Sequence, residues 1–148
     1  MGKGVLIRPS KVRPLYRGEK YISRMLLDHT NSGTDKIHIN HGIVPKGVSL
    51  YPASAHGTEN DAFDEIYVIL KGKCKLYIDG DILDLEPSDV VYIPSGVLHA
   101  LDNTEGTEDT EILTVWAGVP PKGINDNYDL RLEQWGKTYM TVDEVEGK

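Results

Sequence analysis

Short apolar runs, separated by turn residues, recur every eight to twelve positions along the chain, while patterns with a helical period are scarce. This arrangement is typical of an all-β sandwich or barrel. The runs predict strands at 21–27, 36–44, 48–51, 65–70, 73–78, 82–85, 90–93, 98–102 and 111–117. The breaks between them carry turn chemistry, with glycines at Gly47, Gly72, Gly80 and Gly96.

The alternation within 65–70 predicts two different faces for this strand. One face is apolar, and we expect it to pack against the core: Ile66, Val68 and Leu70. The other carries Glu65, Tyr67 and Ile69, which suits a part-polar interior. A small barrel with a ligand cavity requires this of a strand that lines its mouth.

Length and charge limit the class of protein. The 148 residues suit one domain, and a net charge of -7 argues against a nucleic-acid partner, which needs clustered cations. No apolar run approaches the roughly 18 residues of a membrane span, so we expect no membrane partner and a soluble, cytoplasmic protein. The single Cys74 alternates with Leu76 and Ile78 and is expected to be a buried thiol.

Two sequence boxes resemble those of the cupin family. The stretch PSDVVYIPSGVLHALDN holds Pro94, Gly96, His99 and Asn103 at the spacing of the second box, with Ser88 in place of its leading glycine. Six residues separate Glu65 from Gly72, as in the first box.

The resemblance implies a double-stranded β-helix, or jelly-roll, barrel. We expect the barrel over 36–118, an N-terminal arm and first strand over 1–35, and a C-terminal extension over 119–148. The extension is expected to be a loop with a short helix ending at Gly136.

The resemblance also implies a metal site, with one departure. Two histidines should precede Glu65 by four to six positions, but these places hold other residues, and the nearest histidine is His56. A bulged loop would let His56 join Glu65 and His99 on one divalent ion, either Mn, Fe, Ni or Zn. Glu59 or Asp61 would supply a fourth ligand, and Glu59 has the longer reach. The alternatives are a salt bridge for Glu65, a core position for His99, and a barrel without metal.

Asp61, Tyr67 and His38 are candidates for proton transfer beside the metal. His38 enters this set if the turn at Pro45–Gly47 pairs the strands on its two sides, because residue 38 would then face residue 54, on the same side as His56. His29 and His41 are expected to be structural or surface residues.

These residues predict a metal-dependent enzyme that acts on a small polar substrate, a sugar derivative or an oxoacid. Isomerase or lyase chemistry and dioxygenase chemistry both stay open. The alternative is a non-catalytic barrel that binds or senses a small molecule. We also expect a homodimer formed by sheet extension, since the strand YISRMLL at 21–27 lies outside the boxes and would need a partner for its backbone.

Overall fold

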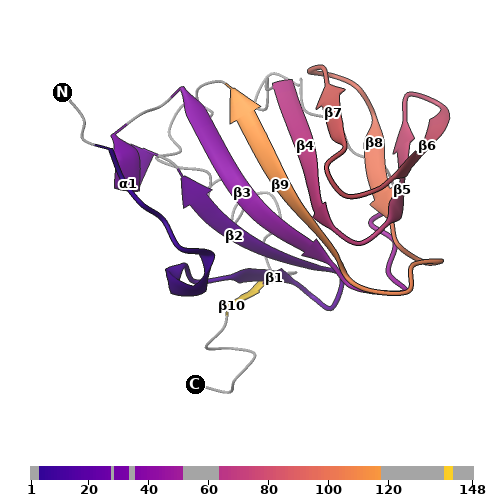
Figure 1. The fold of residues 1–148 in the computed structure, drawn as a ribbon, viewed down its shortest axis with the longest axis horizontal. Coiled ribbons are helices and arrows are strands. Elements are labelled where there is room, and N and C mark those ends of the chain that lie inside the picture. The colour runs from indigo at the N-terminus through magenta and orange to yellow at the C-terminus, as the bar shows by residue number, and fades with distance from the viewer. Residues whose placement is uncertain (1–3, 28, 34–35, 52–63, 118–138, 142–148) are drawn as a thin grey trace.

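The computed structural model describes residues 4–27, 29–33, 36–51, 64–117 and 139–141, and within these ranges the chain forms two antiparallel sheets (Figure 1). The larger sheet has seven strands in the order β10-β1-β2-β3-β9-β4-β7. Its strands are β1 (Leu15–Arg17), β2 (Tyr21–Leu27), β3 (Ile37–Val44), β4 (Asp64–Lys71), β7 (Val90–Ile93), β9 (Thr110–Ala117) and β10 (Tyr139–Thr141). The smaller sheet has the order β6-β5-β8, from β5 (Cys74–Ile78), β6 (Asp81–Leu85) and β8 (His99–Asp102). Two short helical elements precede β3, η1 (Pro9–Lys11) and α1 (His29–Ser32).

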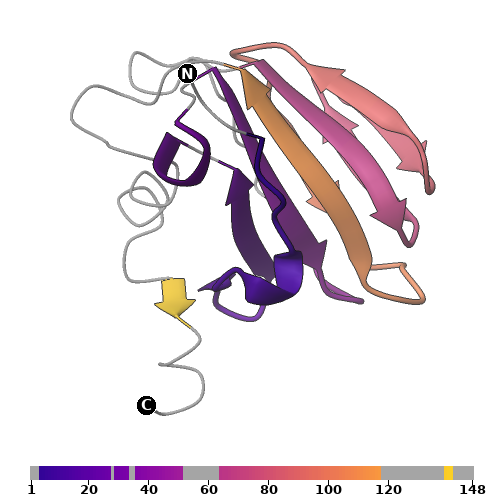
Figure 2. The same ribbon diagram turned by 60° about the vertical axis from the view of Figure 1, so that its left-hand side comes forward.

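One hydrophobic core joins the two sheets. The larger sheet contributes Val44, Ile69 and Ile112, and the smaller sheet contributes Leu76 and Leu101, all at most 2% exposed. The two sheets are seen from a second direction in Figure 2, where the long strands of the larger sheet run side by side. This packing confirms the predicted all-β class.

The strand predictions at 21–27 and 90–93 match β2 and β7. The prediction of a strand at 48–51 is wrong: this stretch makes one isolated bridge, between Ser49 and Asp102. Its backbone bonds to the end of β8 through Leu50 N and Val48 O. A turn at Pro45–Gly47 starts the segment and a proline follows it at once, which leaves little room for a ladder.

The strand at 21–27 is not an edge strand. β2 pairs with β1 on one side, through Ile22 and Tyr16, and with β3 on the other, through Ile22 and Ile43. The backbone groups that were expected to need a second copy are thus paired within the chain. The homodimer remains a prediction, but this strand does not provide the reason for it.

The prediction for β4 is right for one face and wrong for the other. Glu65, Tyr67 and Ile69 do turn to the interior, where they are 3%, 8% and 1% exposed. The expectation that the alternate residues pack against the core is wrong: Ile66 and Val68 are half-buried, and Leu70 is 45% exposed. They lie on the outer face of the larger sheet.

Glycines at the predicted turns have the backbone conformation that those turns need. Gly47, Gly72, Gly80 and Gly96 all have φ between +80° and +87°. Ser88, at the place of the second box's leading glycine, has φ +77°, a region that L-residues other than glycine enter at a cost.

Asn103 closes the second box as a structural anchor. Its side-chain amide donates to the carbonyl oxygens of Val44, Pro45 and Glu108 at 3.0–3.2 Å, and the residue is fully buried. A Cβ at Gly106 would lie 1.8 Å from Asn103 Oδ1, so only glycine fits there. These contacts tie the β8–β9 loop to the end of β3.

No helix within the described ranges is long and apolar enough to cross a membrane.

Candidate functional site

The interior between the two sheets is polar at one end and apolar at the other. Three strands of the larger sheet set this division through their register. At one end the inward row crosses β3, β9 and β4 at His38, Trp116 and Glu65. The next row holds Asn40, Thr114 and Tyr67, and the row after that holds Gly42, Ile112 and Ile69. Polar side chains therefore gather at the end where β3 and β4 begin.

A buried acid and imidazole meet at this polar end, one from each sheet. Glu65 lies on β4 of the larger sheet and His99 on β8 of the smaller one. The distance between Glu65 Oε2 and His99 Nε2 is 3.2 Å, and the side chains are 4% and 3% exposed. The two sequence boxes thus bring together the two residues that the resemblance singled out.

Neighbouring groups orient the His99 ring. Its Nδ1 lies 2.8 Å from the carbonyl oxygen of Val97, which accepts a hydrogen bond when Nδ1 carries a proton. Nε2 is then the nitrogen that faces Glu65. Tyr67 packs edge-on against the same ring, with centroids 5.8 Å apart.

The charge of this pair has to be compensated, because a carboxylate removed from water is costly unless a cation or proton accompanies it. Two arrangements satisfy the geometry. A proton on His99 Nε2 would make an ion pair with Glu65. A metal cation would instead accept the Nε2 lone pair and a carboxylate oxygen together.

His38 lies on the inner face, but the register that led to its prediction is wrong. β3 pairs with β2 and β9, so the residue opposite His38 is Trp116 and not residue 54. His38 is fully buried, and Trp116 separates it from Glu65 along the same row. It belongs to the wall of the polar end.

A hydrogen-bonded network, which sequence reasoning missed, starts at Asn40 in this wall and extends along β2 toward the apolar end, since Ser23 is opposite Gly42. The Ser23 hydroxyl donates to Asn40 Oδ1 at 2.5 Å, and Asn40 Nδ2 donates to the Tyr21 hydroxyl at 3.2 Å. Ser23 and Asn40 are fully buried. The alternation of polar with apolar residues in 37–40 was the available signal, since every second position there turns inward.

Three predicted site residues, His56, Glu59 and Asp61, lie outside the described residues. Within the described ranges, no group of three His, Cys, Asp or Glu side chains forms that could hold a metal ion. His41 is on the outer face of β3, where its Nε2 lies 3.7 Å from Glu111 Oε1. Burial lowers the pKa of His41 below its ordinary value, against the raising effect of Glu111. His29 belongs to α1.

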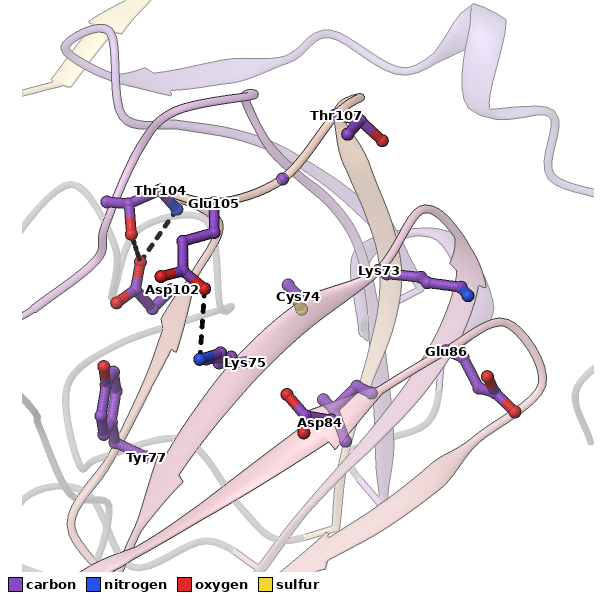
Figure 3. A pocket seen from close by; sticks show the side chains of 12 residues that line it. Lys73, Cys74, Lys75, Tyr77, Asp84, Glu86, Asp102, Thr104, Glu105 and Thr107 are labelled. Atoms are coloured by element: carbon purple, nitrogen blue, oxygen red, sulfur yellow. Dashed lines mark hydrogen bonds and ion pairs between the residues drawn. The ribbon is translucent and has the colours of Figure 1, made fainter.

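A separate hollow of about 430 Å³ lies on the outer face of the smaller sheet (Figure 3). Three of its charged groups have partners within the hollow. Lys75 Nζ lies 3.2 Å from Glu105 Oε2, and Asp102 Oδ1 accepts from the backbone and hydroxyl of Thr104 at 2.9 and 2.7 Å. Lys75 alternates along β5 with the buried Leu76, so this hollow faces away from the Glu65–His99 pair.

The chain is similar to one known protein family. The family model described as "Cupin domain" matches residues 43–116, half of the chain. No curated protein matches the sequence.

Several solved structures share the fold. A predicted oxalate decarboxylase from Thermotoga maritima has 23% identity and a TM-score of 0.65, over 76% of this chain and 98% of that one. The polyketide cyclase RemF from Streptomyces resistomycificus has 17% identity and a TM-score of 0.65, over 89% and 94%. The DMSP lyase DddQ from Ruegeria pomeroyi DSS-3 has 26% identity and a TM-score of 0.57, over 67% of this chain and 47% of the lyase.

Proposed function

Since the chain belongs to the cupin family, we propose that it is a metal-dependent enzyme acting on a small polar substrate, with Glu65 and His99 as two of the metal ligands. The observation that carries the proposal is the buried Glu65–His99 pair at the polar end of the interior. A buried carboxylate is unstable unless a cation compensates its charge, and a divalent metal is a cation that the carboxylate and the imidazole nitrogen can both bind.

The distance between the two groups fits this role. Carboxylate oxygen and imidazole nitrogen bind such metals at about 2.1 Å. Two ligand atoms at that distance are about 3.0 Å apart at an octahedral angle and about 3.4 Å apart at a tetrahedral angle. The 3.2 Å between Glu65 Oε2 and His99 Nε2 lies between these values. The Val97 carbonyl holds Nδ1, as outer partners of metal-bound histidines do.

His56 and Glu59 are the proposed third and fourth ligands, on sequence grounds alone. They stand within ten residues before Glu65, and His56 is the nearest imidazole that precedes it in the chain. Two imidazoles with carboxylates suit Mn, Fe, Ni or Zn, so the donor set does not select among these four.

The remaining polar groups have roles toward the substrate in this proposal. The metal would polarise a carbonyl or enediol oxygen, or present O2, once bound. His38 lies on the same inner row as Glu65, with Trp116 between them, and in this proposal it exchanges a proton with a substrate that lies over this row. Tyr67 keeps the His99 ring in place through its edge contact and can offer its hydroxyl, and Asp61 is a further proton carrier.

The polar side chains of the inner wall bear on the class of substrate. Hydroxyl and amide groups at Ser23, Asn40 and Thr114 favour a ligand with several oxygen atoms, such as a sugar derivative or an oxoacid. The similar structures include a predicted decarboxylase, a lyase and a cyclase, which supports isomerase or lyase chemistry. Dioxygenase chemistry is the alternative. Turnover with oxygen excluded separates the two, because only a dioxygenase would stop.

The proposal is tested by metal content. Protein purified without added metal, then reloaded with Mn, Fe, Ni or Zn in turn, should hold one of them stoichiometrically. His99→Ala should weaken that binding by more than about 100-fold, since removing even a supporting partner of a ligand costs about 10–100-fold. Glu59→Ala should weaken it less, because water can replace one ligand. His41→Ala is the matched control, a histidine on the outer face of the same sheet, and should leave binding unchanged.

A non-catalytic binding barrel is the second candidate. The observation that favours it is the first box, which lacks two histidines at family spacing before Glu65. Wild type that holds none of the four metals stoichiometrically would contradict the metal proposal and leave this candidate in its place. Equal loss of metal in His99→Ala and His41→Ala would also contradict it.

A further inference from the structure

A short connection between the two sheets carries His99 into the site. β7 of the larger sheet ends at Ile93, and β8 of the smaller sheet begins at His99 (Figure 1). We call the residues between them, 94–98, the bridging turn. Glu65 lies on β4 of the larger sheet, so whatever holds the bridging turn against β4 also sets the position of His99 relative to Glu65.

Strand pairing reaches the bridging turn from both sides. On the smaller sheet, β8 pairs with β5 from His99 onward, and the Asp79 N–H donates to the Leu98 carbonyl oxygen at 2.9 Å. On the larger sheet, the pairing of β4 with β7 runs as far as Glu65 and Ile93. The ladder of the larger sheet thus ends where the bridging turn begins.

The side chain of Asp64 extends this attachment beyond the ladder. Asp64 Oδ1 accepts a hydrogen bond from the backbone N–H of Ser95 at 3.0 Å. The carboxylate also accepts from the Tyr92 hydroxyl, and this hydrogen bond raises the pKa of Tyr92 above its ordinary value. One carboxylate at the start of β4 therefore contacts both the end of β7 and the bridging turn.

Alternation along β4 places this carboxylate beside the site but on the other side of the sheet. Asp64 and Glu65 are adjacent in the chain and turn to opposite faces, since Asp64 is exposed and Glu65 is 3% exposed. Asp64 therefore faces away from the Glu65–His99 pair. Its influence on the pair has to pass through the backbone of the bridging turn.

A short path leads through the bridging turn to the His99 ring. The Val97 N–H donates to the Pro94 carbonyl oxygen at 3.2 Å, and Gly96 has φ +85°, as the third position of a type II turn requires. The Val97 carbonyl oxygen then lies 2.8 Å from His99 Nδ1. A shift of Ser95 would move this carbonyl group, and the ring would move with it.

We propose that Asp64 is a positioning residue of the metal site: by holding the bridging turn against β4, it sets the orientation of the His99 imidazole toward Glu65. The inference rests on the proposed function, because it concerns the same site. A carboxylate that accepts a backbone N–H makes a charge-assisted hydrogen bond, which is stronger than a neutral one. Loss of a partner that orients a metal-bound histidine typically weakens metal binding by about 10–100-fold.

Metal affinity of the full chain, measured by competition with a chelator, is the first test. The ion is the one among Mn, Fe, Ni and Zn that the wild type binds most tightly. Asp64→Ala should raise the dissociation constant about tenfold, at the lower end of the range because Asp64 acts through the turn. Asp64→Asn should raise it by less than about threefold, since an amide oxygen accepts the same N–H more weakly.

Two further variants separate positioning from a general loss of stability. Ser95→Pro removes the same hydrogen bond from its donor side, and proline suits the second position of a type II turn, so this variant should fold and should behave like Asp64→Ala. Asp89→Ala is the matched control. Asp89 is an exposed aspartate before the other end of β7, where its Oδ2 accepts the Glu86 N–H at 2.9 Å. Its loss should leave the dissociation constant unchanged.

A second measurement needs no metal. In metal-free protein labelled with ¹⁵N-histidine, the ring resonances of His99 are identified by their absence in His99→Ala. Asp64→Ala and Ser95→Pro should shift or broaden these resonances, because the Val97 carbonyl no longer holds Nδ1 in one place. Asp64→Asn and Asp89→Ala should leave them at their wild-type positions.

The outcomes distinguish this inference from the proposed function. A wild type that binds none of the four metals, with His99 resonances that still respond to Asp64→Ala and Ser95→Pro, contradicts the proposed function and supports the positioning role. Unchanged resonances in these two variants overturn the positioning role, whether or not a metal binds. An equal change in Asp89→Ala also overturns it. So does a metal-binding protein in which the resonances move but the dissociation constant stays the same.

Discussion

Replacing Ser88 by glycine should stabilise the protein. Ser88 has φ +77° in the turn between β6 and β7, and its backbone N–H donates to the Ile69 carbonyl oxygen at 2.8 Å. Holding an L-residue in this left-handed region costs about 1–2 kcal/mol. Glycine removes that cost but gives the unfolded chain more freedom, which costs about 0.4–1 kcal/mol. Taking the middle of each range, the net gain for Ser88→Gly is about 0.8 kcal/mol.

This gain is measurable by urea unfolding, followed by circular dichroism, at constant m. In a chain of this size about 1 kcal/mol corresponds to about 2–4 °C in melting temperature, so Ser88→Gly should raise the melting temperature by roughly 1–4 °C. Gly96→Ser is the matched control in the opposite direction. Gly96 has φ +85° and a Cβ there would meet no atom within 4 Å, so only the conformational cost applies.

The reasoning is refuted if Gly96→Ser destabilises as expected while Ser88→Gly is neutral or destabilising. The Ser88 side chain would then stabilise the folded state by more than its positive φ destabilises it. Gly72→Ser should be the most destabilising of these three substitutions. A Cβ at Gly72 would lie 2.6 Å from the Asp109 carbonyl oxygen, so the backbone would have to move. The loss in free energy of unfolding should therefore be larger for Gly72→Ser than for Gly96→Ser.

Two further predictions concern buried groups. Asn103→Ala should lower the free energy of unfolding by about 2 kcal/mol, because it removes the amide that donates to the carbonyl oxygens of Val44 and Glu108, while the Pro45 carbonyl oxygen still accepts from Val48 N–H; a loss under about 1 kcal/mol in urea unfolding would contradict this. Burial raises the pKa of Cys74 from 9.0 to about 11, so folding keeps the thiol protonated and stability should fall as pH rises from about 9 toward 11. Cys74→Ala should remove this part of the alkaline decline, and at pH 8 the wild-type thiol should react with a disulfide reagent only as fast as the chain opens.

The inner faces of the strands were predictable from the sequence because the side-chain period of a strand is two. Glu65, Tyr67 and Ile69 form one set of alternate positions, and the structure buries that set. The contact between Glu65 and His99 could not be predicted from this side-chain period. It depended on two residues 34 positions apart, in two boxes that only the family resemblance connected.

The parts that escaped prediction depend on contacts between distant segments. β1 is three residues long and has no alternation to detect, yet it pairs with β10, more than 120 positions later. The outward set of β4 was assigned to the core because apolar residues were assumed to face inward. Its true position shows that the sequence pattern identifies two faces of a strand without saying which of them the second sheet covers.

The proposed site depends on the register of β4. A slip of one residue would turn Glu65 outward and Ile66 inward, so the position of the acid is fixed by strand pairing. Glu65 is opposite Trp116 on one side and Ile93 on the other, and the only irregularity between β4 and β9 in the described ranges falls at Ile69–Lys71, at the far end of the strand. The regular end therefore keeps Glu65 on the inner face, where it meets His99, and keeps Ile66 on the outer face. A slip would separate the acid from the imidazole and bury Ile66 among polar side chains, so the same pairing maintains the site and excludes the alternative register.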